Sequence, residues 1–109
     1  MKWIYLIIAI ITEVIATSAL KESQGFSKII PSIVVITGYS LTFYFMSLTL
    51  KEMSVGITYA IWSGMGILLI SLIGYFRYNQ VLDSAAILGM SFIATGIIIL
   101  RFFSKSLDL

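Results

Sequence analysis

Long apolar runs alternate with short polar connections along the chain. The runs cover Trp3–Leu20, Ile29–Leu50, Gly56–Phe76 and Ala85–Phe103. Each is close to the roughly 20 residues that an α-helix needs to cross the hydrocarbon core of a bilayer. The connections read KESQGFSK, KEMSV and RYNQVLDS, and connections this short make consecutive helices antiparallel. The pattern predicts an all-α membrane protein in which residues 1–109 form a single four-helix transmembrane domain.

The composition agrees with a membrane protein and narrows its chemistry. Of the 109 residues, 60% are hydrophobic and 11% are charged, whereas soluble domains have about 25% charged residues. Glu13 interrupts the first run and no soluble domain follows, which argues against a secretory signal peptide. Cysteine and histidine are absent, and neither a metal-ligand cluster, a nucleophile–base pair nor a nucleotide-binding loop can be assembled. We therefore expect no enzyme activity, no metal or cofactor, and no nucleic-acid partner.

Glu13 is the acidic residue that lies inside an apolar run. An ionised side chain at bilayer depth costs a few kcal/mol even on lenient scales, and such groups usually mark an ion or proton pathway. No Lys or Arg lies deep in a run, so a structural ion pair is not expected. A permanently protonated, hydrogen-bonded carboxyl is the alternative. Because the sequence contains no nucleotide-binding loop, we predict that an ion gradient supplies the energy for the protein's activity and that Glu13 binds this ion.

Helical spacing brings polar, small and aromatic side chains near this carboxyl group. On the first run, Ala9, Ala16 and Thr17 lie three or four residues from Glu13; the alanines leave room, and Tyr5 lies about two turns away. The second and third runs each contain a set of residues at three- and four-residue steps. These are Tyr39, Thr42, Phe43 and Met46 in the second run, and Tyr59, Trp62, Ser63 and Gly66 in the third. A carboxylate among aromatic rings is suited to a bulky organic cation. Interfacial belts or packing would also use aromatic residues, but Trp62 lies well inside its run, unlike a belt residue.

Gly89 and Gly96 are seven residues apart and share one face of the fourth run. Small residues allow helices to approach closely in lipid. These glycines either pack helices within one chain or form a seam for a second copy, and spacing alone does not separate the two.

The distribution of basic residues gives almost no orientation signal. With four spans, one side of the membrane has Lys2, Lys51, Arg101 and Lys105, and the other has Lys21, Lys28 and Arg77. An excess of Lys and Arg normally marks the cytoplasmic side. A count of four basic residues on one side against three on the other does not determine the orientation. Either a partner fixes it, or the chain inserts in both orientations.

Several stretches together resemble the small multidrug resistance transporters, over essentially the whole chain. They are TEVIATSALK (Thr12–Lys21), GFSKIIPS (Gly25–Ser32), GITYAIWSGMGILLIS (Gly56–Ser71), Leu82–Asp83, and the Gly89/Gly96 pair. The resemblance implies an antiparallel, dual-topology dimer of identical or sister chains in a bacterial inner membrane. It also implies proton-coupled antiport, in which protons and lipophilic cationic drugs compete for the membrane glutamate.

The same resemblance assigns expected roles to residues of this chain. Glu13 matches the proton- and substrate-binding glutamate, and the substrate-facing aromatic residues are Trp62, Tyr59 and Tyr39. Further pocket positions are Tyr5, Phe43, Thr17 and Ser63, to which the spacing argument adds Ala9. Ala16 stands where guanidinium exporters of the family usually have Trp, which favours the quaternary ammonium type. Ala16 also replaces a glycine common in drug exporters, and Gln24 replaces a frequent acidic residue.

Two other functions stay open at this point. One is export of guanidinium-like or polyamine cations, with or without a sister subunit. The other is a membrane assembly protein with no transport of its own, which the aromatic residues around one carboxylate argue against.

Overall fold

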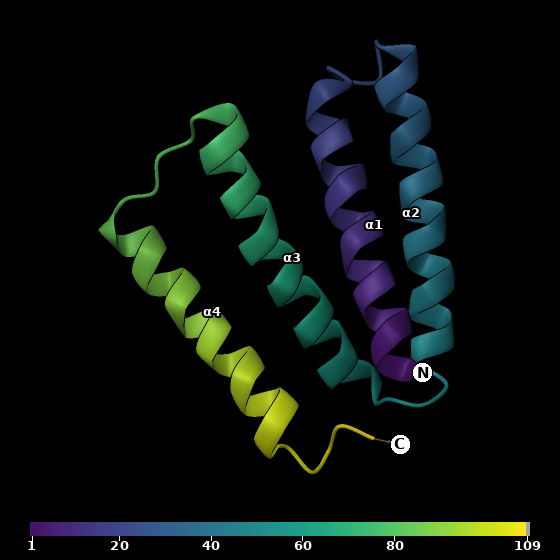
Figure 1. Ribbon diagram of the computed structural model, residues 1–109, viewed down its shortest axis with the longest axis vertical. Helices are drawn as coiled ribbons and strands as arrows, with labels where there is room; N and C mark the ends of the chain where they lie inside the picture. Colours follow the sequence, from purple (N-terminus) through teal and green to yellow (C-terminus); the bar gives the residue numbers. More distant parts are fainter. Residues whose placement is uncertain (109) are drawn as a thin grey trace. The chain divides into compact units, whose positions relative to one another are not determined.

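The computed structural model describes residues 1–108, and these form four α-helices joined by short loops (Figure 1). The helices are α1 (Lys2–Glu22), α2 (Ile29–Thr49), α3 (Val55–Tyr78) and α4 (Ser84–Phe103). All four are long and apolar enough to cross a membrane. The predicted all-α class and the four spans are therefore confirmed.

The helix ends differ from the apolar runs by at most two residues. α1 continues through Lys21 and Glu22, because long charged side chains are good helix formers and do not by themselves end a helix. α3 likewise continues to Tyr78 and ends where Asn79 adopts a left-handed backbone conformation, with φ of 55°. Asn is one of the few residues that adopt this conformation at low cost. Hydropathy locates the spans, whereas local backbone geometry determines their ends.

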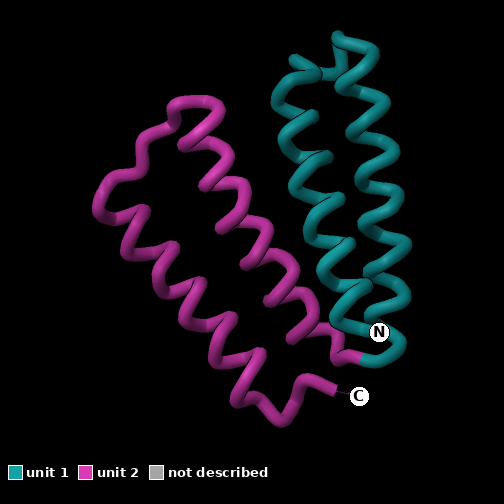
Figure 2. Tube along the Cα trace, in the orientation of Figure 1, with its two compact units in different colours: residues 1–52 teal, residues 53–109 magenta. Residues whose placement is uncertain are grey.

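The chain divides into two compact units, each of which is a helical hairpin (Figure 2). The first unit is Met1–Glu52 and contains α1 and α2; the second begins at Met53 and contains α3 and α4. That residues 1–109 form a single four-helix domain stays a prediction.

The first unit is held together by a close approach of α1 and α2 near their middles. A Cβ atom added to Gly38 of α2 would lie 2.8 Å from the Cβ atom of Ala16 on α1. Nearby, the hydroxyl groups of Thr12 and Thr42 are 2.7 Å apart and share a hydrogen bond between the two helices. Small residues and interhelical hydrogen bonds are the main means of helix association in lipid. Gly38 and Ala16 therefore bring α1 and α2 close enough for polar side chains to meet.

The α1–α2 loop is a tight turn around Ser23, whose side chain is fully buried. The Ser23 hydroxyl donates to the carbonyl of Leu20 and accepts from the N–H of Phe26. Gln24, Gly25 and Phe26 all have positive φ angles, which only glycine adopts without a steric cost. The Ser23 contacts stabilise this turn, so α2 starts at a defined position relative to α1.

The second unit uses local caps at both ends of its hairpin. Asp83 is the N-cap of α4, and its side chain accepts a hydrogen bond from the Ala86 N–H at 2.8 Å. At the other end, the N–H of Ser54 donates to the Leu107 carbonyl at 2.9 Å, and the Ser54 hydroxyl donates to the Ser106 carbonyl at 2.8 Å. The C-terminal tail thus folds back onto the start of α3.

α4 differs from the other three helices because none of its residues is buried in the structure. A Cβ atom added to Gly89 or Gly96 would meet nothing within 4 Å. Gly64 of α3, in contrast, lies against Ile93 and Ile97 of α4. Within the second hairpin the two α4 glycines thus make no close contact with α3, and whether they pack helices of one chain or form a seam for a second copy stays a prediction.

We expect the substitution Gly38→Ala to destabilise the protein, because the added methyl group would overlap Ala16 and the Thr12 carbonyl. Overpacking of this kind costs about 1–3 kcal/mol. Thermal unfolding in detergent should show a lower midpoint for this variant. Gly56→Ala is the control, since a Cβ atom at Gly56 meets nothing within 4 Å. An unchanged midpoint for Gly38→Ala would contradict the close approach of α1 and α2.

Candidate functional site

A chain of hydrogen bonds links Glu13 on α1 to Tyr39 on α2. The hydroxyl of Thr17, one turn after Glu13, donates to Glu13 Oε1 at 2.8 Å. The same Thr17 oxygen lies 2.6 Å from the Tyr39 hydroxyl. A threonine hydroxyl has only one proton to donate. Because that proton goes to Glu13, the Tyr39 hydroxyl donates to Thr17, and the donors run from Tyr39 through Thr17 to the carboxyl group.

The second oxygen of Glu13, Oε2, is buried and has no hydrogen-bond partner among the residues that the structure describes. A carboxylate can accept about four hydrogen bonds, and a buried acceptor without a partner is costly. Nor do the described residues contain a group of acidic side chains that could hold a metal ion. One oxygen of Glu13 is thus held by the protein, and the other has no partner among the described residues; that it binds a proton or a cation stays a prediction.

Aromatic residues of the first unit lie near this hydrogen-bonded group. The rings of Tyr39 and Phe43 have centroids 6.4 Å apart and are stacked at 21°, and Phe43 is 60% exposed. Tyr5 packs against Phe45, with centroids 6.0 Å apart. The structure therefore links Glu13 to Tyr39 through Thr17 and places Phe43 beside Tyr39, whereas Tyr5 packs against Phe45.

The second unit contains the other predicted aromatic residues. Tyr59 and Trp62 lie on successive turns of α3, with centroids 5.5 Å apart in an edge-on arrangement. Tyr59 is 61% exposed. The Ser63 hydroxyl donates to the Tyr59 carbonyl at 2.7 Å, so it is used within the helix. That these three residues share one pocket with Glu13 stays a prediction.

The two alanines predicted to leave room beside Glu13 have no exposed surface in the structure. The small side chain of Ala16 is used for the contact with Gly38. Ala9 is equally buried, and its carbonyl accepts a hydrogen bond from the Thr12 hydroxyl at 3.2 Å. The role of Ala9 as a pocket residue stays a prediction.

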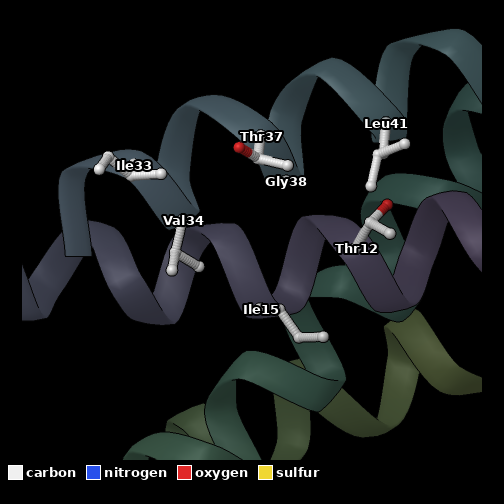
Figure 3. Close-up of a pocket in the computed structure, with 7 residues that line it drawn as sticks. All are labelled: Thr12, Ile15, Ile33, Val34, Thr37, Gly38 and Leu41. Atoms are coloured by element: carbon white, nitrogen blue, oxygen red, sulfur yellow. The ribbon is translucent and has the colours of Figure 1, made fainter. Parts of the chain in front are cut away.

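An apolar groove of about 280 Å³ runs along the α1–α2 hairpin (Figure 3). None of the residues predicted for the site lines it; the lining residues are Thr12, Ile15, Ile33, Val34, Thr37, Gly38 and Leu41. No charged or aromatic side chain is among them, so the groove lacks the groups that the predicted cation site requires. Gly38 lines this groove, whereas Glu13, Thr17 and Tyr39 do not, so the groove is distinct from the carboxyl site.

Some residues that shape the site were not foreseen from the sequence. Thr12 and Gly38 hold α1 against α2, and Phe45 packs on Tyr5. Hydroxyl and glycine positions inside apolar runs are the signal for the first two, because such residues are typical of helix contacts in membranes. No pattern in the sequence distinguishes Phe45 from the other aromatic residues of its run.

Comparisons with known proteins agree with one another. A family model described as Small Multidrug Resistance protein matches residues 1–93. The chain is 50% identical to the quaternary ammonium compound-resistance protein QacE of Escherichia coli, over 95% of this chain and 94% of that protein. It is 46% identical to a multidrug transporter of Pseudomonas aeruginosa, over 96% of each chain. The quaternary ammonium compound-resistance protein QacC of Staphylococcus aureus is 40% identical, over 97% of this chain and 99% of that one.

We expect Thr17→Val to change the environment of Glu13, because it removes the donor to Oε1. At low pH, the carbonyl stretch of the protonated Glu13 side chain should move to a higher infrared frequency, as for a carboxyl group that has lost a hydrogen bond. Tyr39→Phe should give a smaller shift, since Tyr39 acts through Thr17. Glu13→Gln identifies the band by removing it. An unchanged band in Thr17→Val would show that Thr17 does not bind the carboxyl group.

Proposed function

The chain belongs to the small multidrug resistance family, and we propose that it exports hydrophobic and quaternary ammonium cations in exchange for protons, as an antiparallel dimer of two identical chains. The family membership and the four spans make it a multi-pass protein of the bacterial inner membrane, a drug efflux transporter and not an enzyme. The proposal concerns what drives transport, where the cation binds and how two chains assemble.

The buried, unpartnered Oε2 atom of Glu13 is the observation on which the proposal depends. A charge at bilayer depth is tolerable only beside an opposite charge. No Lys or Arg lies deep in an apolar run. The carboxyl group is therefore stable in two forms, either protonated or ionised next to a bound cation. One group with two mutually exclusive partners is the minimum requirement for exchange of a proton for a cation.

The hydrogen bonds from Tyr39 through Thr17 support this exchange. A donor to Oε1 stabilises the ionised carboxylate, so the protein compensates part of the cost of releasing the proton. Oε2 remains the position where a proton leaves and a cation arrives. When the cation departs, a proton returns to the same oxygen, and the empty site is neutral again.

Aromatic rings supply what a quaternary ammonium cation needs. Such a cation has no N–H group, so its recognition relies on attraction to ring faces and on an opposite charge. The rings available are the exposed Tyr59 with Trp62 on α3, and Tyr39 with Phe43 on α2. Relatives named for resistance to quaternary ammonium compounds support the same class of substrate for this chain.

Ala16 supports this class over guanidinium-like cations. A Cβ atom added to Gly38 would lie only 2.8 Å from the Ala16 methyl group, which is too close for a normal contact. The Trp that guanidinium exporters usually have at this position would not fit between α1 and α2 here. The α1–α2 contact of this chain is thus built for a small residue at position 16.

The exposed surface of α4 supports assembly with a second copy. None of its residues is buried, and the space over Gly89 and Gly96 is open. A glycine seam of this kind allows a second helix to approach closely. The nearly balanced Lys and Arg residues favour insertion in both orientations, which provides an antiparallel partner from the same gene product.

The central test is the substitution Glu13→Gln. We expect it to abolish proton-coupled export and to weaken binding of tetraphenylphosphonium by more than about tenfold, because the charge that pairs with the cation is lost. In the native protein, binding should weaken as the pH falls and should release protons. Glu13→Asp should retain part of the activity with a changed pH dependence. Export and binding can be measured in proteoliposomes and by calorimetry.

Glu52→Gln is the matched control, because it removes an exposed carboxylate of the α2–α3 loop. It should leave binding and its pH dependence unchanged. Undiminished proton-driven export by Glu13→Gln would overturn the proposal, since no other acidic residue lies within an apolar run.

The topology of the chain can be tested by adding one positive charge. Because the chain has no cysteine, a single Ser106→Cys reporter can be labelled with a membrane-impermeant maleimide. In the native background we expect labelling from both sides of the membrane. Glu52→Lys raises the Lys and Arg count of its side from four to five, against three, and should favour one orientation and lower resistance. Glu52→Gln should label like the native chain.

Labelling of the native chain from one side alone would defeat the homodimer. In that case a sister subunit of opposite orientation would be required.

A further inference from the structure

Thr58, at the end of the first turn of α3, has a hydroxyl group that is fully buried and has no hydrogen-bond partner among the described residues. Other hydroxyl groups of α3 donate to the carbonyl oxygen four residues earlier: Ser63 to Tyr59 and Ser71 to Ile67, each at 2.7 Å. The corresponding carbonyl for Thr58 is that of Ser54, which accepts the Thr58 N–H at 3.0 Å. The side chain of Thr58 does not follow the usual pattern of its own helix.

A hydroxyl group that is buried without a partner is unfavourable compared with a methyl group of the same shape. Valine has nearly the shape of threonine, fills the same space and avoids this cost. A threonine here therefore destabilises the state seen in the structure. Its hydroxyl is useful only if a partner reaches it in another state of the protein.

The position of Thr58 indicates which kind of partner it meets. Thr58 and Trp62 are four residues apart on α3, so they share a helix face with Cβ atoms about 5–6 Å apart. Trp62 in turn forms the edge-on pair with Tyr59 at 5.5 Å. A cation held against an aromatic ring lies within about 6 Å of the ring centroid. An ammonium group held at this pair would therefore lie beside the stretch of α3 that contains Thr58.

We propose that Thr58 is a specificity-determining residue whose hydroxyl accepts a hydrogen bond from an N–H group of the bound cation. The chain then takes protonated primary and secondary amines as substrates in addition to quaternary ammonium cations. This inference rests on the proposed transport of cations at the aromatic pair. Because the hydroxyl has no exposed surface here, the amine reaches it when the residues that cover α3 move, as alternation between the two sides of the membrane requires.

The two classes of cation differ in what the hydroxyl offers them. A quaternary ammonium group has no proton to donate, so Thr58 contributes little to its binding. A protonated amine loses water from its N–H groups when it enters an apolar site, and an acceptor must replace that water. Thr58 supplies such an acceptor on α3, independently of the carboxylate.

A matched pair of ligands and three variants test this role. Dodecyltrimethylammonium and dodecylammonium have the same alkyl chain and differ in whether N–H groups surround the charge. Each is titrated as a competitor of tetraphenylphosphonium in proteoliposomes with the full chain. In Thr58→Val we expect the affinity for dodecylammonium to fall roughly three- to tenfold, the usual range for one hydrogen bond. Affinity for dodecyltrimethylammonium should stay within about twofold, and Thr58→Ser should bind both ligands like the native chain.

The outcomes separate this inference from the proposed function. Equal losses for both ligands in Thr58→Val, or no loss for dodecylammonium, would overturn the role of the hydroxyl while transport of cations stands. Failure of the native chain to bind either ligand would overturn the proposed function itself. Retained dodecyltrimethylammonium binding shows that Thr58→Val is folded. If it does not fold, Thr58→Ala compared with Thr58→Ser gives the same test of the hydroxyl.

Discussion

A carboxyl group inside a membrane-spanning helix, with no Lys or Arg deep in any apolar run, is the constraint on which the candidate site depends. Thr17, oriented by Tyr39, donates to one oxygen of Glu13, and the other oxygen has no partner among the residues that the structure describes. The result is a carboxyl group with one oxygen held by the protein and the other left open, which is what the proposed exchange of a proton for a cation requires.

The packing of α1 against α2 makes that arrangement possible. Three interhelical pairs, Thr12 with Thr42, Ala16 with Gly38, and Thr17 with Tyr39, occur within about two turns of each helix. A hydrogen bond of 2.6 Å between side chains of two helices requires a defined register. The close approach at Gly38 and the threonine pair set this register, so that residues with no direct contact to a ligand determine how Glu13 is held.

Much of the fold and part of the site could be predicted from the sequence, for identifiable reasons. Apolar runs located the four helices within two residues at each end, because the thickness of the bilayer determines their length. Helical spacing placed Thr17 beside Glu13. It could not show that Tyr39 completes the chain of donors, because the register between two helices depends on the contact at Gly38. Spacing also could not show that the Ser63 hydroxyl is used by its own helix or that the Thr58 hydroxyl is not.

The exposed surface of α4 allows this helix to change by mutation independently of the first hairpin. α1 and α2 hold the carboxyl group, whereas α4 contributes no buried residue and leaves its glycines open. Substitutions on α4 therefore leave the core of the first hairpin untouched. If α4 forms the proposed seam with a second copy, mutation of this one helix would alter which chain associates with it while the hydrogen bonds to Glu13 stay intact. Duplicated copies would then separate into self-associating and partner-dependent forms by changes confined to α4.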